Sequence, residues 1–97
     1  MSFAKALEED RRLAILRLLS EAPGYSVNSS VLQAALQSFA HRVSRDRVHG
    51  DLAWLREQGL VTIEEFDSVV VATLSARGLD VAQGAADHPG VKRPAPK

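Results

Sequence analysis

Apolar residues recur at helical spacing through the first part of the chain. Over residues 3–21 they return every three or four positions while charged residues fall mainly on the other faces, which predicts a helix of about five turns. The apolar positions are Leu7, Ala14, Ile15, Leu18 and Leu19, and the charged ones are Glu8, Glu9, Arg11, Arg12 and Arg17. Ser2 can cap this helix, and Pro23 with Gly24 ends it. The same spacing over residues 31–39 predicts a short second helix that ends near Ala40.

A third helix is expected over residues 45–58, after a short connection at residues 40–43. Ser44 stands at the N-cap position, and apolar residues then repeat at i, i+4 and i+7. These apolar residues are Val48, Leu52 and Leu55. Gly59 is the type of residue that ends a helix, so we expect the chain to change direction there.

Beyond Gly59 the spacing changes from helical to strand-like. Residues 60–63 and 69–74 are β-rich runs, and Asp67 with Ser68 forms a turn between them, so a β-hairpin is predicted. Ser75 then caps a last short helix over residues 76–86. The predicted fold is mainly α with a β-hairpin, and it consists of a three-helix core, a two-stranded hairpin and a C-terminal helix.

Composition indicates one small globular domain without thiol chemistry. The chain has 97 residues, of which 45% are hydrophobic and 25% charged, and this length suits a single core. The absence of cysteine excludes disulfides, thiolate metal sites and cysteine nucleophiles. No apolar run approaches the roughly 20 residues that span a bilayer, and residues 1–12 are charged where a signal peptide is apolar. We therefore expect a soluble, cytoplasmic protein without membrane contact.

The end of the chain differs from the rest. From residue 87 onward prolines and a glycine replace the core-forming pattern, and basic residues add positive charge. These residues are Pro89, Gly90, Lys92, Arg93, Pro94, Pro96 and Lys97. The sequence thus predicts a folded domain over residues 1–86 and a flexible basic tail over residues 87–97.

Two helices joined by a tight connection and followed by a hairpin form the winged helix-turn-helix arrangement. Residues 44–61 resemble the recognition helix and first wing strand of winged-helix regulators of the ArsR, MarR and DeoR type. Their sequence is Ser-Arg-Asp-Arg-Val-His-Gly-Asp-Leu-Ala-Trp-Leu-Arg-Glu-Gln-Gly-Leu-Val. Residues 73–82 are similar to the segment that closes the wing in those regulators. The chain is also similar to small winged-helix proteins of Mu-like transposable prophages. The resemblance implies sequence-specific binding of double-stranded DNA and regulation of bacterial or bacteriophage genes.

The outward side of the third helix carries the candidate DNA-binding residues. The N-terminal residues of a recognition helix reach base edges and phosphates in the major groove, and arginine, histidine and serine can donate hydrogen bonds there. The candidates are Arg42, Ser44, Arg45, Arg47, His49 and Gly50. Lys92 and Arg93 in the tail can add contacts to the DNA backbone.

The charge pattern limits any phosphate-binding surface. The chain has 12 basic and 12 acidic residues, whereas domains that depend on phosphate contacts carry an excess of Lys and Arg. The hairpin offers Glu64, Glu65 and Asp67 where a wing that touches DNA offers Lys or Arg, so we expect it not to grip phosphate. The alternative hypothesis is a winged-helix module that binds a protein partner instead of DNA.

A homodimer is expected if the protein binds DNA, because one such domain makes few contacts and two copies can read two half-sites. In similar regulators the first and last helices form the dimer interface. The apolar residues assigned to it are Phe3, Leu7, Leu79 and Val81, and the alternative is that these residues complete the monomer core.

The sequence holds no catalytic motif. His41, His49 and His88 lack the spacing of metal ligands, no glycine-rich phosphate loop occurs, and no serine stands in a nucleophile elbow. We therefore expect neither an enzyme nor a protein with a metal or other cofactor.

Overall fold

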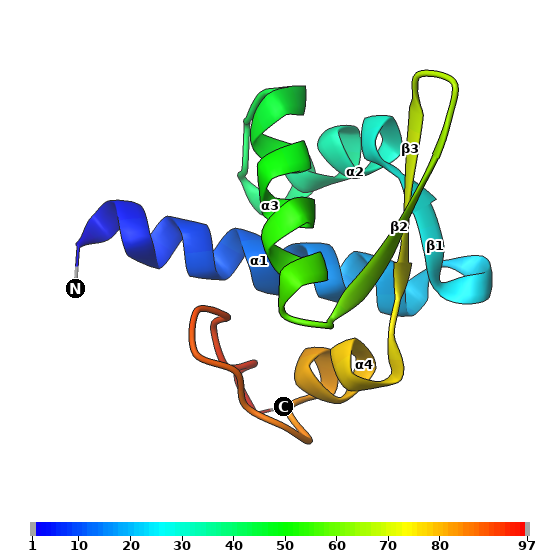
Figure 1. Cartoon of the computed structure of the whole chain (residues 1–97). Coiled ribbons are helices and arrows are strands. Elements are labelled where there is room, and N and C mark those ends of the chain that lie inside the picture. The colour runs from blue at the N-terminus through cyan, green and yellow to red at the C-terminus, as the bar shows by residue number, and fades with distance from the viewer. Residues whose placement is uncertain (1, 97) are drawn as a thin grey trace.

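Helix α1 (Phe3–Glu21) crosses the molecule behind α3 (Arg45–Glu57), and its first turns project beyond the other helices (Figure 1). The structure is a computed structural model that describes residues 2–96. The elements that follow α1 are η1 (Pro23–Tyr25), β1 (Ser26–Asn28), α2 (Ser29–Leu36), η2 (Gln37–Phe39), α3 (Arg45–Glu57), β2 (Val61–Phe66), β3 (Val69–Leu74) and α4 (Ala76–Gln83). The mainly α fold predicted from the sequence, with its hairpin and last helix, is confirmed.

Each of the four α-helices begins at a polar side chain that caps it. Ser2, Asn28, Ser44 and Ser75 each accept a hydrogen bond from a backbone N–H three residues further along, which satisfies a donor that the first turn leaves unpaired. The three serine caps stand where the sequence predicts them. Asn28 caps the second helix, which begins at Ser29.

Two helices are shorter than the apolar spacing predicts. Helix α2 ends at Leu36, because the chain tightens into η2 and Ala40 then adopts a left-handed conformation with φ of 64°. Helix α4 ends at Gln83 instead of residue 86, because Gly84 takes φ of 79° and closes the helix. In both cases a local backbone reversal stops the helix before its apolar pattern ends.

The hairpin belongs to a three-stranded antiparallel sheet in the order β1-β3-β2. Strand β1, which the sequence did not predict, pairs Ser26 with Thr73 and Asn28 with Val71. The side chains of Ser26 and Thr73 add a hydrogen bond of 2.6 Å between their hydroxyl oxygens. A three-residue strand is too short to show an alternating pattern of its own, and its partner strand supplies the pairing.

The core lies between α1, the two helices of the helix-turn-helix and the inner face of the sheet. Its largest fully buried side chains are Ile15, Leu16, Leu19, Leu32, Leu36, Val48, Leu52, Leu55, Leu60 and Val61. The three expected apolar positions of α3 are all among them. Helix α3 therefore stands on the core with its polar side turned outward.

The segment after α4 packs back onto α1 and α3, contrary to the expectation that it contributes nothing to the core. Val91 is only 8% exposed, and the backbone N–H of Lys92 donates to the carbonyl of Glu9. Arg12 Nη1 donates to the Gly90 carbonyl at 2.9 Å, and its guanidinium lies 3.9 Å from the centre of the Trp54 ring. The sequence does not predict this packing, because a single buried valine among prolines and glycines gives no repeating apolar pattern.

Candidate nucleic-acid interface

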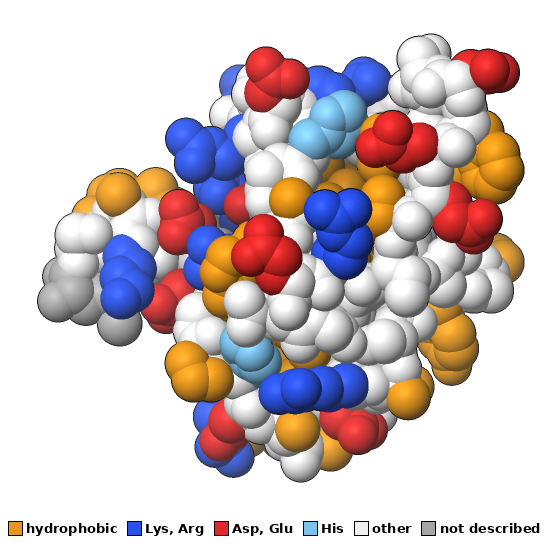
Figure 2. All heavy atoms as spheres, in the orientation of Figure 1, with side chains coloured by type: hydrophobic (Ala, Val, Ile, Leu, Met, Phe, Trp, Pro, Cys, Tyr) orange, Lys and Arg blue, Asp and Glu red, His pale blue; other side chains and the backbone are white. Residues whose placement is uncertain are grey.

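The N-terminal end of α3 presents a group of exposed basic side chains. Arg42 lies in the turn before the helix, and Arg45 and Arg47 lie in its first turn. Among residues 2–96, none of the three forms an ion pair, whereas Arg11, Arg12, Lys92 and Arg93 each do. Figure 2 shows basic side chains around this end of α3 with an acidic side chain among them, and Asp46 lies in the same first turn. Positive charge is thus left available at the end of the helix that a major groove would receive.

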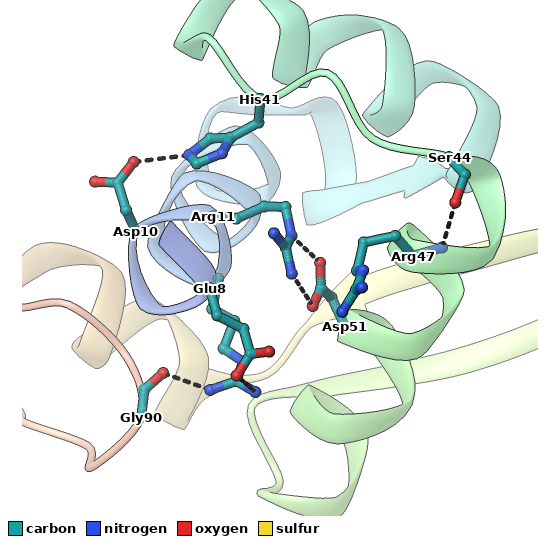
Figure 3. A network of polar contacts seen from close by, with 9 residues as sticks. Glu8, Asp10, Arg11, His41, Ser44, Arg47, Asp51 and Gly90 are labelled. Carbon is teal, nitrogen blue, oxygen red and sulfur yellow. Dashed lines mark hydrogen bonds and ion pairs between the residues drawn. The ribbon is translucent and has the colours of Figure 1, made fainter. Parts of the chain in front are cut away.

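Ser44 is the N-cap residue of α3. Its Oγ accepts a hydrogen bond of 3.1 Å from the backbone N–H of Arg47 (Figure 3). The cap fixes the first turn, so the arginines project from a defined backbone. Gly50, one turn further on, is exposed, and a Cβ built at that position meets nothing within 4 Å. This glycine leaves open space on the outer side of the helix.

Helix α2 holds two of the candidate side chains of α3. Arg45 Nε donates to Gln33 Oε1 at 2.7 Å, and Arg45 Nη2 donates to Ser30 Oγ at 3.3 Å. His49 is half-buried, and its Nε2 lies 2.9 Å from Oγ of the buried Ser29. Sequence reasoning treated Arg45 and His49 as free outer-face residues, and it missed the three α2 side chains that contact them.

A buried ion pair fixes α3 on α1. Arg11 is 6% exposed and Asp51 is 4% exposed. Arg11 Nη2 donates to Asp51 Oδ1 at 3.0 Å, and its Nε makes a second, parallel bond to Oδ2 (Figure 3). The hydrogen bonds that Arg11 donates to Asp51 raise the pKa of Arg11, against the opposing effect of burial. Arg11 was expected on an outer polar face, and this expectation is wrong because Asp51 receives it inside the interface between the two helices.

The turn before α3 is fixed to α1 by a second polar contact. His41 is 5% exposed, and its Nε2 donates to Asp10 Oδ2 at 2.7 Å (Figure 3). Lys92 Nζ donates to the other Asp10 oxygen at 3.3 Å. His41 lies in the connection that the sequence predicts at residues 40–43, and the structure buries its imidazole. The two contacts join α1, the turn and the C-terminal segment at one carboxylate.

Stability is expected to fall in acid as Asp10 is protonated. Partial burial acts to raise the pKa of Asp10, but the hydrogen bonds and positive charges of His41 and Lys92 outweigh it and leave the pKa below its ordinary value of 3.8. A lowered pKa contributes stability that is present above pH about 4 and is lost as the pH falls through the folded-state value. Thermal melts from pH 6 to pH 2 should therefore show a steeper acid decline for the native chain than for Asp10→Asn. Parallel declines would contradict this role.

The hairpin tip is acidic, as the sequence indicates. Glu64, Glu65 and Asp67 are all exposed, and so is Phe66, at 58%. None of the three carboxylates forms an ion pair within residues 2–96. Figure 1 shows the tip beyond the sheet, at the same side of the molecule as the start of α3. Any polyanion at α3 therefore meets negative charge beside it.

The residues assigned to a dimer interface fall into two groups. Phe3 is 79% exposed and Leu7 is 41% exposed, on the part of α1 that projects from the body. Val81 is only 3% exposed, so its assignment to an interface is wrong: it completes the monomer core. Leu79 is half-buried and packs against that same core. The structure therefore leaves only the α1 residues of this set fully available to a partner.

The basic residues of the C-terminal segment are not gathered with those of α3. Lys92 pairs with Asp10, and Arg93 Nη1 donates to Asp87 Oδ2 at 2.9 Å. In Figure 1 this segment lies near α4 and the C-terminal end of α3. Arg45 and Arg47 begin that helix, so the two basic groups lie at its opposite ends.

Two further findings concern metals and membranes. Within residues 2–96 no group of three His, Cys, Asp or Glu side chains is placed to hold a metal ion. In the same part of the chain, no helix has the length and apolar character needed to cross a bilayer.

The arrangement of helices and hairpin matches solved winged-helix structures. HlyU from Vibrio cholerae N16961 has 29% sequence identity and a TM-score of 0.59, and the match covers 78% of this chain and 80% of that chain. The structure of the hsRosR-S4 complex matches with 20% identity and a TM-score of 0.62, over 81% of this chain and 76% of that chain. The chain is thus a winged helix-turn-helix protein.

Sequence comparison defines the family. The uncharacterized protein gp26 of Escherichia phage Mu is 50% identical over 91 residues, which are 94% of each chain. An uncharacterized protein of Haemophilus influenzae is 46% identical over 80 residues, or 81% of this chain and 78% of that one. No protein-family model matches the chain. The chain belongs to the family of phage Mu gp26.

Proposed function

We propose that this protein is a transcription regulator that binds specific sequences in double-stranded DNA with α3 in the major groove. The observation that carries the proposal is the group of exposed arginines without ion pairs at the start of α3. The fold supports it, because the second helix of a helix-turn-helix is the element that enters the groove. HlyU from Vibrio cholerae N16961, a structural neighbour with 29% identity, shares this fold. Membership of the gp26 family points to phage genes or their bacterial host as the target.

The candidate residues differ in the part of the DNA that each could contact. Arg45 and Arg47 can donate to guanine or to phosphate, and Arg42 and Ser44 lie where they can reach the backbone. His49 has Nε2 engaged with Ser29, so only its other ring nitrogen is left for DNA. Gly50 lets the groove approach the helix closely, because no Cβ stands there. The footprint is small, which agrees with the neutral net charge.

Selection from a genomic duplex library tests this function. The protein is mixed with the library at two salt concentrations, and the retained duplexes are sequenced. Retention of a common sequence that weakens at the higher salt concentration is expected for phosphate contacts combined with base reading. Absence of retention even at low salt would overturn the proposal.

The regulator is proposed to act as a homodimer that pairs through the projecting part of α1. Phe3 and Leu7 line a groove of about 410 Å³, together with Ala6 of the same helix and Val91 of the C-terminal segment, and charged side chains form the rest of its lining: Glu9, Asp10, Lys92 and Arg93. A projecting helix end with exposed apolar side chains gains stability when a second copy covers it. Two copies would then present two α3 helices to two half-sites.

Phe3→Asp is expected to dissociate this dimer without unfolding the monomer. Burying one Phe side chain contributes about 1.5–3 kcal/mol, so the dissociation constant should rise at least about tenfold. Phe3 is 79% exposed in the monomer, so the thermal midpoint at high dilution should not change. Sedimentation equilibrium measures the effect, and Phe66→Asp, at a 58% exposed position on the hairpin, is the control. Equal dissociation constants for both variants and the native chain would show that this face is not the interface.

The acidic hairpin favours a second candidate function, a module that binds a protein partner. Its three exposed carboxylates flank the exposed Phe66 in the sequence, and such a surface repels DNA but suits a basic protein segment. The library selection separates the two functions, because this module would retain no duplex at either salt concentration.

A further inference from the structure

Helix α2 makes a side-chain contact that fixes the geometry of a proposed DNA-reading residue. Gln33 is half-buried between α2, the turn and α3. Its Nε2 donates to the Val43 carbonyl at 3.1 Å, and its Oε1 accepts from Arg45 Nε at 2.7 Å. Ser30 Oγ accepts from Arg45 Nη2 at 3.3 Å. One amide therefore joins three parts of the helix-turn-helix.

The orientation of the Gln33 amide is determined by its two partners. If the amide were turned over, its carbonyl would face the Val43 carbonyl and its NH₂ group would face the guanidinium of Arg45. Both contacts would then be repulsive, because each would set like groups against each other. The Gln33 oxygen is thus directed at Arg45 by the backbone of the turn.

This contact selects which edge of Arg45 is free. A guanidinium has five N–H donors in a fixed plane, and Gln33 and Ser30 occupy the side edge formed by Nε and Nη2. The end edge, with donors on Nη1 and Nη2, remains available. Two parallel donors of this kind match the O6 and N7 acceptors of guanine in the major groove.

We infer that Gln33 is a positioning residue that makes Arg45 specific for guanine, without touching DNA itself. The inference rests on the proposed function, because Arg45 can contact a guanine only if α3 binds double-stranded DNA. Gln33 removes rotational freedom from Arg45 before binding, so the end edge meets the base in one orientation. An arginine without this support can turn to a nearby phosphate, which carries no sequence information. The Gln33 contact therefore affects sequence preference, whereas the charge of Arg45 affects overall affinity.

The test is the sequence preference of Gln33→Met, a variant of similar length without hydrogen-bonding groups. Library selection should show preference for guanine at one position of the half-site reduced about tenfold relative to the native chain. Affinity for unrelated duplex should stay within about twofold, because the positive charge of Arg45 is kept. Gln37→Met, at an exposed position in η2, is the matched control and should leave the preference unchanged.

Two further variants separate positioning from folding. Ser30→Ala removes the longer of the two contacts from an exposed position, so it should lower the same preference by a smaller factor with no change in thermal midpoint. In an Arg45→Ala background, Gln33→Met should have no further effect on sequence preference. A native chain that selects a sequence, with Gln33→Met and Ser30→Ala both selecting it equally well, would overturn the inference and leave the proposed function intact. A native chain that retains no duplex would overturn both.

Discussion

Replacing Arg45 and Arg47 together with alanine is expected to lower the affinity for the selected duplex by about 100-fold or more, which abolishes binding in an ordinary titration. Each good arginine contact to a base is worth about 1–3 kcal/mol, and the pair supplies two of the three basic side chains at the start of α3. Both side chains are exposed and lack ion pairs within residues 2–96, and the hydrogen bonds from Arg45 to Gln33 and Ser30 lie at the surface, so the thermal midpoint should change little.

Fluorescence anisotropy with a labelled duplex measures this loss. Arg56→Ala with Arg77→Ala removes the same charge from exposed positions in the last turn of α3 and in α4, and it serves as the control. The control variant should lose much less affinity, because its arginines lie away from the start of the helix. An unchanged affinity in the Arg45 and Arg47 variant would refute the assignment of α3 to the groove.

Asp51→Ala is expected to destabilise the protein by about 3–5 kcal/mol, the cost of leaving a buried charge without its partner. The guanidinium of Arg11 would stay 6% exposed between α1 and α3 with no carboxylate to accept its hydrogen bonds. A small domain has about 5–15 kcal/mol of stability in total, so the loss is a large part of the whole.

Urea titration followed by circular dichroism measures the change. Asp46→Ala removes a carboxylate from the exposed first turn of the same helix and should cost less than about 1 kcal/mol. The double variant Arg11→Met with Asp51→Leu should recover much of the stability, because no charge remains to be buried. A midpoint for Asp51→Ala equal to that of Asp46→Ala would show that the ion pair contributes nothing.

Local signals in the sequence predict the main elements of this fold correctly. The bounds of α1, the capping serines and the change from helical to alternating spacing after Gly59 are all read from neighbouring residues. Strand β1 cannot be predicted from neighbouring residues, because it has three residues and pairs with β3, more than 40 positions away. Elements that depend on a distant partner are the ones that the sequence conceals.

The same difference applies to the candidate site. Arg45 and Arg47 can be proposed from the sequence, because position in a recognition helix and side-chain chemistry are both local properties. Arg11 and Asp51 are 40 positions apart in the sequence. Their pairing buries two charged residues that a polar pattern predicts to be exposed to solvent. Gln33 carries no signal of its own, because its role depends on how α2 crosses the turn. The sequence thus allows residues to be proposed as DNA contacts, and the tertiary structure shows which side chains hydrogen-bond to them.

The packing around Trp54 gives the protein an internal optical probe. Trp54 is the single tryptophan of the chain, and it contacts the guanidinium of Arg12 and the ring of His88, whose centroid lies 5.6 Å away. Gly90 lies so close that a Cβ there would come within 2.8 Å of the indole. Release of the C-terminal segment would remove the imidazole and admit water to the indole. Intrinsic fluorescence therefore reports, without any added label, whether the end of the chain is docked.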